Sequence, residues 1–255
     1  MRQIAPLILT SLLSIQMAVA APVESKMASI EKAITTELKK LDASIPIETI
    51  KLSPMDGVYM VTLKGGHVLY TSANGKYLLR GDMLEVRGNG VVNLSEEVRN
   101  KANADLLKSL KVEDMIVFSP KGETKAVVYA FTDVDCGYCR KLHQEVAAMN
   151  DYGIELRYLA FPRGGERAPA YDKMVDAWCA ADRKKAMTDL KTGKTIPAIE
   201  DATKKKVCQD IVESQQQLGM AMGVNGTPAM VLEDGQLIPG YRPADDLANM
   251  LKLSK

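Results

Sequence analysis

Residues 126–139 read AVVYAFTDVDCGYC, and this stretch decides the fold. It opens with a continuous apolar run, which is typical of a strand buried on both faces of a sheet. Cys136 and Cys139 follow, with two residues between them, and apolar residues then recur at helical spacing as far as Met149. The stretch therefore predicts a buried strand, a short loop, and a helix that begins at the first cysteine.

Elements on the C-terminal side extend this unit to a complete domain. The sequence predicts a strand at 154–161, helices at 169–190 and 204–222, a hairpin at 229–238 and a last helix at 243–253. The order β-α-β, helical insertion, β-β-α is that of a thioredoxin-type domain. We therefore expect an α/β thioredoxin-like catalytic domain with a helical insertion over residues 113–255.

The N-terminal part of the chain has a different pattern. Apolar residues at spacings of three and four predict a helix over 24–42, and short apolar runs predict strands within 57–86. Asn74-Gly75 is a strong hairpin signal, whereas 87–93, which contains two further glycines, has the composition of a loop. These features predict a small α+β N-terminal domain over residues 21–93.

A mostly polar helix is predicted next, over 94–110. Asn93 and Glu96 have the spacing of a capping box at its start. A polar helix between two folded modules suits a spacer, so we expect a linker helix over 94–112. The alternative is that this helix packs on one of the two domains.

The start of the chain has the features of a secretory signal peptide over residues 1–20. Arg2 precedes an apolar segment, and Ala18-Val19-Ala20 forms a small-x-small cleavage site. The apolar segment is too short, and too interrupted by Pro6, for a membrane-spanning anchor. We therefore expect export to an oxidising compartment, in which cysteines pair.

Composition and charge exclude several classes of protein. The chain has 33 Lys and Arg against 32 Asp and Glu, a net charge of +1, so it has no basic excess to bind nucleic acid or an anionic membrane. With 46% hydrophobic residues it is neither disordered nor fibrous. Four cysteines are too few for a disulfide-stapled mini-protein, so their positions carry the information.

The positions of Cys136 and Cys139 indicate redox chemistry. A helix N-terminus carries free N–H groups and a partial positive charge, which lower the pKa of a thiol placed there. The thiolate is the form that attacks disulfides. We therefore predict Cys136 as the catalytic nucleophile and Cys139, one helical turn further on, as the resolving thiol.

Other roles for this pair are disfavoured. Half of a zinc site would need partners, but the remaining cysteines form no second C-x-x-C and neither histidine has ligand spacing, so no metal and no cofactor is predicted. An inert structural pair is disfavoured because a two-residue loop is a poor staple. His143 lies about 10 Å along the helix from Cys136, too far to act as its base, so we expect a structural or surface role.

Two further motifs complete the predicted site. Thr227-Pro228, just before the hairpin, is expected to contain a cis peptide beside the cysteines, where an extended substrate chain can pair. Together with Gly137 and Tyr138, these are the predicted substrate-binding residues. Cys179 and Cys208 lie in the two helices of the insertion, and we predict a structural disulfide between them, with a second redox pair as the alternative.

These residues together resemble the DsbC family of bacterial periplasmic protein disulfide isomerases. The resemblance extends over the whole chain after the signal peptide. It is carried by FTDVDCGYCRKLH at 131–143, RYLAFPR at 157–163, AWCA at 177–180, GVNGTPA at 223–229 and PGY at 239–241. The chain departs from the family pattern in a longer Lys-rich stretch at 199–206, which leaves the chemistry unaffected.

The resemblance implies more than the residues do by themselves. It implies a V-shaped homodimer joined through cystatin-like N-terminal domains, with an uncharged cleft that holds misfolded substrates and gives chaperone activity. It also implies a membrane thiol reductase of the DsbD type that keeps the active-site pair reduced. Carried over onto this sequence, Cys136 and Cys139 are the redox pair, Pro228 is the cis-proline, and Cys179–Cys208 is the structural disulfide.

The predicted function is therefore a periplasmic protein disulfide isomerase that acts on misfolded, disulfide-containing secreted proteins. Gly-Tyr between the cysteines favours this branch over the related DsbG branch, which typically carries Pro-Tyr. The alternatives are a dithiol oxidase that donates disulfides, and a DsbG-like holdase or reductase of single thiols.

Overall fold

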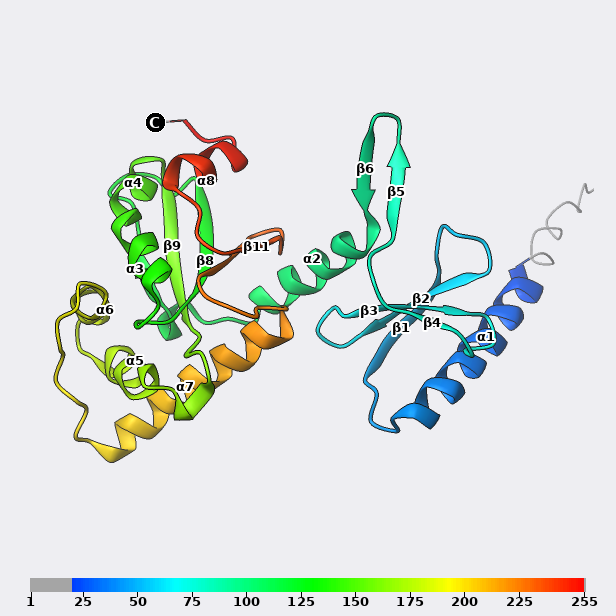
Figure 1. The fold of residues 1–255 in the computed structure, drawn as a ribbon, viewed down its shortest axis with the longest axis horizontal. Helices are drawn as coiled ribbons and strands as arrows, with labels where there is room; N and C mark the ends of the chain where they lie inside the picture. Colours follow the sequence, from blue (N-terminus) through cyan, green and yellow to red (C-terminus); the bar gives the residue numbers. More distant parts are fainter. Residues whose placement is uncertain (1–19, 255) are drawn as a thin grey trace, which may run out of the picture. The chain divides into compact units, whose positions relative to one another are not determined.

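The computed structural model describes residues 20–254 and divides the chain into two compact units (Figure 1). The first unit comprises the described residues up to Lys64 together with Leu69–Gly81, and the second comprises Gly65–Val68 and the chain from Asp82 onward. The predicted signal peptide, apart from its last residue, lies outside the described residues. Between residues 20 and 254, no helix combines the length and the apolar character needed to cross a bilayer.

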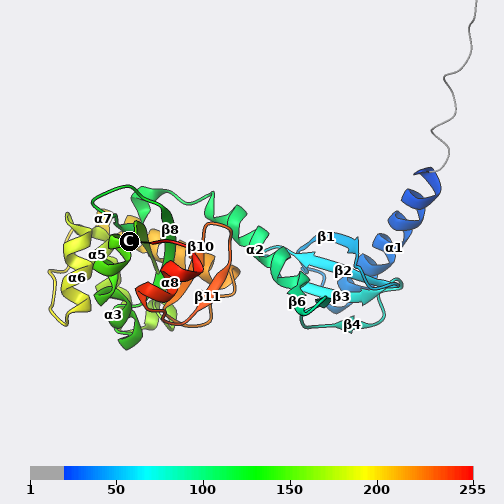
Figure 2. The same ribbon diagram turned by 90° about the horizontal axis from the view of Figure 1, so that it is seen from above.

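The first unit is a helix packed on an antiparallel sheet (Figures 1 and 2). It consists of α1 (Ala20–Leu41), β1 (Ile47–Leu52), β2 (Val58–Leu63), β3 (Val68–Ser72) and β4 (Leu78–Leu79), with strand order β1-β2-β3-β4. Ile34 and Leu38 of α1 are fully buried against Val61 of β2. This is the predicted α+β module, but β1 was not predicted. An irregularity in its pairing between Ile47 and Thr49 interrupts the two-residue period that marks a strand.

A glycine is required in the turn between β3 and β4. Gly75 has φ +71°, a left-handed conformation that disfavours other residues. A Cβ atom there would also lie 2.9 Å from the Cβ of Glu37 and 3.0 Å from the Cα of Ile34, both on α1. The predicted Asn74-Gly75 turn therefore packs closely against α1 at Gly75.

The second unit begins with a hairpin, β5 (Leu84–Arg87) and β6 (Gly90–Asn93). The expectation of a loop over 87–93 was wrong. Gly88, with φ +57°, forms the hairpin turn, and Val91 and Val92 pair with β5. Two glycines close together therefore marked a tight turn between strands.

Helix α2 (Leu94–Leu107) follows directly. The side chain of Asn93 accepts a hydrogen bond from the Glu96 backbone N–H at 3.0 Å, as expected of an N-cap. The helix ends earlier than predicted, and Leu107 packs into a hydrophobic cluster of the C-terminal sheet. Its buried Asn103 donates from Nδ2 to the carbonyl of Gly235 at 3.1 Å. The C-terminal part of α2 thus packs on the catalytic domain, as the alternative prediction had it.

The C-terminal domain is built on a five-stranded sheet with order β11-β10-β8-β9-β7 (Figure 1). The strands are β7 (Ile116–Phe118), β8 (Ala126–Thr132), β9 (Ile154–Ala160), β10 (Ala229–Leu232) and β11 (Leu237–Pro239). Every residue of β8 is buried, and β8 pairs in parallel with β9 and antiparallel with β10. The predicted buried strand is therefore the centre of the sheet, whereas β7 is too short to give a recognisable pattern.

Helices cover both faces of this sheet. They are α3 (Gly137–Gln144), α4 (Val146–Asp151), α5 (Ala170–Cys179), α6 (Arg183–Lys191), α7 (Ala202–Ala221) and α8 (Ala244–Met250). Val128 and Ala130 of β8 belong to the hydrophobic cluster that includes α3–α6 and α8, whereas Val127 and Phe131 belong to the cluster at the ends of α2 and α7. This alternation is the side-chain period of a strand, so β8 contributes to both cores.

Two predicted helices are each split. The helix expected over 136–149 is divided at Glu145 into α3 and α4. The helix expected over 169–190 is divided where Ala180 becomes extended, and the Asp182 side chain then caps α6 by accepting from the Lys185 N–H. The apolar period continues across both breaks, so periodicity alone did not reveal them. The predicted order of elements is nevertheless confirmed, with β7 added in front.

Candidate active site

Cys136 lies at the point where the central strand gives way to a helix. It is the N-cap residue of α3, and its carbonyl accepts the first helical hydrogen bond, from Arg140 N–H at 3.0 Å. Its side chain makes no capping hydrogen bond and is 5% exposed, so the sulfur lies at the positive end of the helix with little water around it. The helix start is the environment that the sequence predicted for this thiol, whereas its burial was not predicted.

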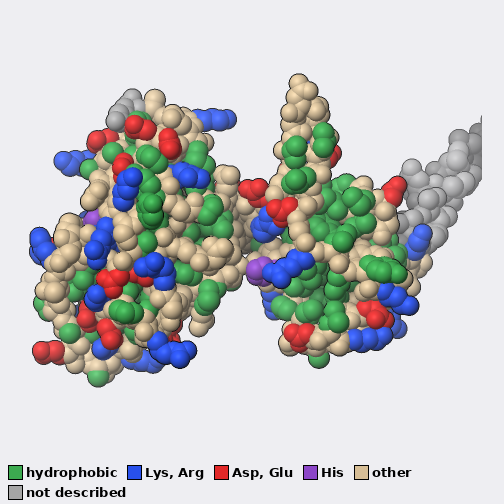
Figure 3. Space-filling model, viewed as in Figure 1, with side chains coloured by type: hydrophobic (Ala, Val, Ile, Leu, Met, Phe, Trp, Pro, Cys, Tyr) green, Lys and Arg blue, Asp and Glu red, His purple; other side chains and the backbone are tan. Residues whose placement is uncertain are grey.

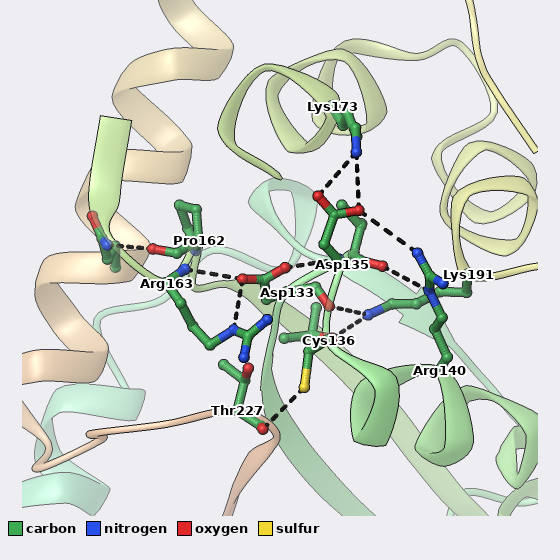
Figure 4. Close-up of polar contacts among 12 residues, drawn as sticks. Asp133, Asp135, Cys136, Arg140, Pro162, Arg163, Lys173, Lys191 and Thr227 are labelled. Atoms are coloured by element: carbon green, nitrogen blue, oxygen red, sulfur yellow. Dashed lines mark hydrogen bonds and ion pairs between the residues drawn. The ribbon is translucent and has the colours of Figure 1, made fainter. Parts of the chain in front are cut away.

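The loop before β10 lies against this sulfur. The Thr227–Pro228 peptide bond is cis. Cys136 Sγ lies 3.2 Å from the carbonyl oxygen of Thr227, to which it donates while it is protonated (Figure 4). The Pro228 carbonyl accepts from Gly240 N–H and is therefore engaged within the domain. Thr227 and Pro228, both predicted as substrate-binding residues, are thus brought beside the first cysteine.

Cys139 lies one turn further along α3 and is fully buried. Both cysteines are free thiols, and the Cys139 thiol donates to the Cys136 sulfur. That hydrogen bond is the main reason why the pKa of Cys136 falls to about 5, helped by the Thr227 hydroxyl and by the nearby charge of Arg163. Burial, followed by the same contact with Cys136, raises the pKa of Cys139 well above its ordinary value. At neutral pH the pair therefore consists of a thiolate at Cys136 and a thiol at Cys139.

Arg163 was not predicted as part of the site. Its Nε and its backbone N–H each lie 3.0 Å from Oδ2 of Asp133, a carboxylate that is 2% exposed (Figure 4). Oδ1 of Asp133 accepts from the Asp135 N–H at 2.8 Å, which also fixes the loop before Cys136. The sequence signal for Arg163 was its place in RYLAFPR, because no spacing rule connects it to the cysteines.

The next carboxylate of this loop is held from two helices. Asp135 accepts from Lys173 of α5 at 2.9 Å and forms a longer ion pair with Arg140 of α3, at 3.6 Å (Figure 4). Arg140 also donates from Nε to the carbonyl of Val134. The segment that carries Cys136 is thus fixed on several sides.

A buried lysine lies behind the cysteines and was also not predicted. Lys191 is the last residue of α6 and is 4% exposed. Its Nζ donates to Thr132 Oγ1 at 2.7 Å and to the Asp133 carbonyl at 2.9 Å (Figure 4). Burial lowers the pKa of Lys191 to about 8, so the side chain remains mostly protonated at neutral pH. In the sequence it lies just after the helix predicted over 169–190, and no pattern there marks it.

His143 has a structural environment, in agreement with the sequence analysis. Nδ1 lies 3.2 Å from the Tyr158 hydroxyl, and Nε2 lies 3.1 Å from Thr188 Oγ1. Burial lowers its pKa to about 4, so the ring is neutral at pH 7. Neither nitrogen contacts a cysteine in these interactions.

The two residues between the cysteines lie at the surface. Tyr138 is 65% exposed and stacks on Tyr241, with ring centroids 6.5 Å apart and planes at 26°. The Nζ of Lys141 lies 4.5 Å from the Tyr241 centroid, and Gly137 has open space where a side chain would project. An accessible aromatic surface therefore lies at the start of α3, between the two cysteines in sequence.

The remaining cysteines are bonded to each other. Cys179 of α5 and Cys208 of α7 form a buried disulfide with a Cα–Cα distance of 5.7 Å. Neither is available as a second dithiol in this state. Within residues 20–254, no group of three or more His, Cys, Asp or Glu side chains could hold a metal ion.

Comparison with known proteins agrees with this geometry. Residues 112–255 match the family model of a thioredoxin-like domain, and residues 18–96 match that of the disulfide bond isomerase protein N-terminal domain. The thiol:disulfide interchange protein DsbC of Dickeya dadantii is 39% identical over 206 residues, 81% of either chain. The protein of the same name from Escherichia coli is 37% identical over 223 residues, 87% of either chain.

A solved structure is also similar. The disulfide interchange protein from Neisseria gonorrhoeae has a TM-score of 0.44 and 27% sequence identity, and the match covers 56% of this chain and 96% of that one. The family membership itself rests on the two family models and on the two relatives above, whose alignments with this chain cover most of their length. The chain belongs to the DsbC family of thiol:disulfide interchange proteins and is a thiol–disulfide oxidoreductase.

Proposed function

We propose that the protein is a periplasmic disulfide isomerase that reduces and reshuffles incorrect disulfides in secreted proteins, with Cys136 as nucleophile and Cys139 as resolving thiol. One observation carries the proposal. The Cys136 sulfur, at a helix N-terminus, lies 3.2 Å from the carbonyl before the cis-proline, and the buried Cys139 thiol donates to it.

The cycle begins with attack by the Cys136 thiolate on one sulfur of a substrate disulfide. The substrate S–S bond breaks, a mixed disulfide forms, and the other substrate sulfur leaves as a thiolate. The low pKa of Cys136 keeps the attacking form populated at neutral pH. Because this sulfur is barely exposed, we expect the substrate to reach it on the side of Thr227, whose carbonyl lies 3.2 Å away.

The mixed disulfide has two exits. If a second substrate thiol attacks it, the substrate leaves with a new disulfide and Cys136 is restored, with no net transfer of electrons. If Cys139 attacks, the cysteines become oxidised and the substrate is reduced by two electrons. The second route consumes reducing equivalents, which is why a membrane thiol reductase of the DsbD type is part of the proposal.

Substrate binding is proposed to use the loop before β10. Once Cys136 is a thiolate it no longer donates to the Thr227 carbonyl, which can then accept an N–H from an extended substrate. The Thr227 hydroxyl is buried, and its contact in the site is with the Cys136 sulfur, so it can donate to substrate once that sulfur is in a mixed disulfide. The stacked Tyr138 and Tyr241 offer apolar surface for neighbouring substrate side chains.

A homodimer with chaperone activity in its cleft is the second part of the proposal. In the first unit, β4 is an edge strand whose Leu78 and Leu79 are exposed, and unpaired edges are ready to pair with another chain. In the second unit, the hairpin β5–β6 exposes Leu84, Val86 and Val91. Figure 3 shows hydrophobic side chains gathered over the strands of the first unit and along the hairpin. Light scattering of the mature protein tests the dimer.

Refolding of a scrambled multi-disulfide substrate tests the catalytic part. We expect Cys136→Ala to abolish acceleration of refolding, whereas Lys184→Met, a change at an exposed position of α6, leaves it intact. Unchanged refolding by Cys136→Ala contradicts the proposal and favours a holdase, whose suppression of aggregation does not need the thiol.

A dithiol oxidase is the second candidate function, and one observation favours it. A strongly lowered pKa at Cys136 stabilises the reduced pair, which makes the disulfide form a stronger oxidant. Alkylation trapping of the cysteines in the cell separates the two functions. The isomerase is held mostly reduced, whereas an oxidase is held mostly oxidised.

A further inference from the structure

Lys191 is a buried charge for which the cycle above has no role. It comes from α6, in the helical insertion, whereas the cysteines lie on α3. Charged lysines are seldom buried without a reason, because desolvation of the ammonium is costly. Its partners are Thr132, the last residue of β8, and the carbonyl of Asp133, so the charge is directed to the segment just before the active site.

The contact with Thr132 connects Lys191 to the resolving cysteine. Because the Thr132 oxygen accepts from the ammonium, its single proton is free to be donated elsewhere. Thr132 and Cys139 are both fully buried. A hydrogen bond from the Thr132 hydroxyl to the Cys139 sulfur lowers the pKa of Cys139 and so favours its thiolate. The positive charge of Lys191 acts on Cys139 in the same direction.

The other groups around Lys191 do not take over this role. Cys136 and Arg140 face it from the start of α3, and the Asp133 carboxylate is bound by Arg163. The Tyr158 ring centroid lies 5.8 Å from the Lys191 Nζ. The charge of Lys191 also helps to lower the pKa of His143, after burial. None of these groups is an acid that holds Lys191 in a direct ion pair. Among the described contacts, the ammonium is bonded only to a hydroxyl and a carbonyl.

We propose that Lys191, acting through the hydroxyl of Thr132, stabilises the thiolate of Cys139 and is thereby a positioning residue for the step that resolves the mixed disulfide. This inference rests on the proposed function, in which Cys139 is the resolving thiol.

In that step Cys139 gives up its proton and its sulfur attacks the Cys136 sulfur. The bond between Cys136 and the substrate sulfur breaks, and the Cys136–Cys139 bond forms. The substrate leaves as a thiolate and takes up one proton from solvent, which replaces the one that Cys139 released. The two cysteines are oxidised by two electrons and the substrate disulfide is reduced by two, so no other reactant is needed.

Lys191 and Thr132 favour ionisation of Cys139 at the stage of the mixed disulfide, when Cys139 has to attack. In the resting enzyme, the Cys139 proton is held in the hydrogen bond to the Cys136 thiolate. In the mixed disulfide that negative charge is gone, so the bond no longer holds the proton. The Lys191 charge, the backbone N–H of Asp133 and the Thr132 hydroxyl then remain as the groups that favour ionisation of Cys139, and Lys191 is bonded to the last of them.

The test compares Lys191→Met with Thr132→Val, the double variant, and Lys184→Met as the matched control on the same helix. The first readout is the lifetime of the mixed disulfide with a disulfide-containing peptide, measured by quenched flow from pH 6 to 9. A Cys139 pKa higher by one lowers its thiolate fraction about tenfold, partly offset by greater nucleophilicity, so we expect resolution about three- to tenfold slower at pH 7. Formation of the mixed disulfide should be unchanged.

The second readout separates this role from a merely structural one. In the Cys136→Ala background, the ¹³Cβ shift of Cys139 reports its titration directly. We expect Lys191→Met and Thr132→Val each to raise the midpoint, with the double variant less than additive because both act along one path, and Lys184→Met to leave it in place. An unchanged midpoint in folded Lys191→Met protein overturns the inference but leaves attack by Cys136, and so the proposed function, standing.

Discussion

The buried carboxylate of Asp133 holds Arg163 beside the active site, with its Oδ2 accepting from both the backbone N–H and Nε of Arg163 at 3.0 Å. Half of the Arg163 side chain remains exposed, whereas Asp133 is almost fully enclosed. The pair therefore joins a fixed anion to a cation that lies close enough to Cys136 to favour its thiolate.

Replacing Arg163 by Met should raise the pKa of Cys136 and lower the free energy of unfolding. The Cys136 pKa rises because a favourable charge is lost, and since Arg163 is half exposed we expect the alkylation rate at pH 5 to fall about two- to threefold. The Asp133 carboxylate keeps only its backbone donors, which should cost about 1–3 kcal/mol in the free energy of unfolding. Arg163→Lys is the control that retains the charge. If Arg163→Lys slows alkylation as much as Arg163→Met does, the effect comes from the shape of the arginine side chain and not from its charge.

The reactivity of Cys136 should follow its low pKa. We expect the rate of alkylation to be half-maximal near pH 5 and constant above about pH 6, far below the ordinary thiol range near 8.5. Cys136→Ser provides the background rate. A midpoint near 8.5 would contradict the assignment of Cys136 as the activated thiol.

The same pKa makes the stability of the reduced protein depend on pH. The folded-state pKa lies below that of the unfolded chain, so between the two values the unfolded state binds more protons. The stabilisation is complete above about pH 8.5 and is lost as pH falls through 5. We therefore expect the difference in unfolding free energy between reduced wild type and Cys136→Ser to shrink from pH 8.5 to pH 5.

His143 should add a second pH dependence at lower pH. Its folded-state pKa of about 4 lies below the ordinary value near 6.5, so its contribution is present above 6.5 and is lost as pH falls through 4. In His143→Gln, we expect the loss of stability between pH 7 and pH 4 to be smaller by about 1–3 kcal/mol. His67→Gln, at an exposed position, is the control and should keep the wild-type slope.

Local sequence determined the parts of the site that could be predicted. Cys136 follows a strand whose apolar run is unmistakable, and the helix start that activates it is encoded within a few residues. Arg163 and Lys191 are different, because each reaches the site from another element and owes its role to burial and to a partner far away in sequence. Such contacts exist only in the folded chain.

The errors in the fold have equally local causes. The loop expected over 87–93 is a strand because Gly88 is used for the hairpin turn. Strand β1 was missed because a pairing irregularity breaks its alternation. In both cases the backbone departs from an ideal period at a single residue, and pattern reading depends on that period.

The Cys179–Cys208 disulfide should stabilise the insertion without taking part in catalysis. It closes a loop across a sequence separation of 29, for which the chain-entropy model gives about 3–4 kcal/mol. We expect the double Ala variant to lose about that much free energy of unfolding, measured with urea. The pH profile of Cys136 alkylation, measured well below the melting temperature of the variant, should stay as in wild type. A change in that profile would indicate that the disulfide also shapes the active site.

Gly235 should be indispensable for the packing of α2 on the catalytic domain. A Cβ atom at this position would lie 1.8 Å from the Asn100 carbonyl oxygen and 2.6 Å from the Ala104 nitrogen, so the backbone of α2 would have to move. Gly193 is a matched control because its φ of +83° is close to the +85° of Gly235, yet nothing lies within 4 Å of its added Cβ. Gly193→Ala therefore measures the backbone strain alone, about 1 kcal/mol.

We expect Gly235→Ala to cost about 1–3 kcal/mol more than Gly193→Ala in the free energy of unfolding, because it adds a backbone clash to the same strain. It should also raise amide hydrogen exchange in α2 around Asn103, whose side chain loses its bond to the Gly235 carbonyl. Equal costs for the two variants, with unchanged exchange in α2, would mean that this helix is not held at Gly235.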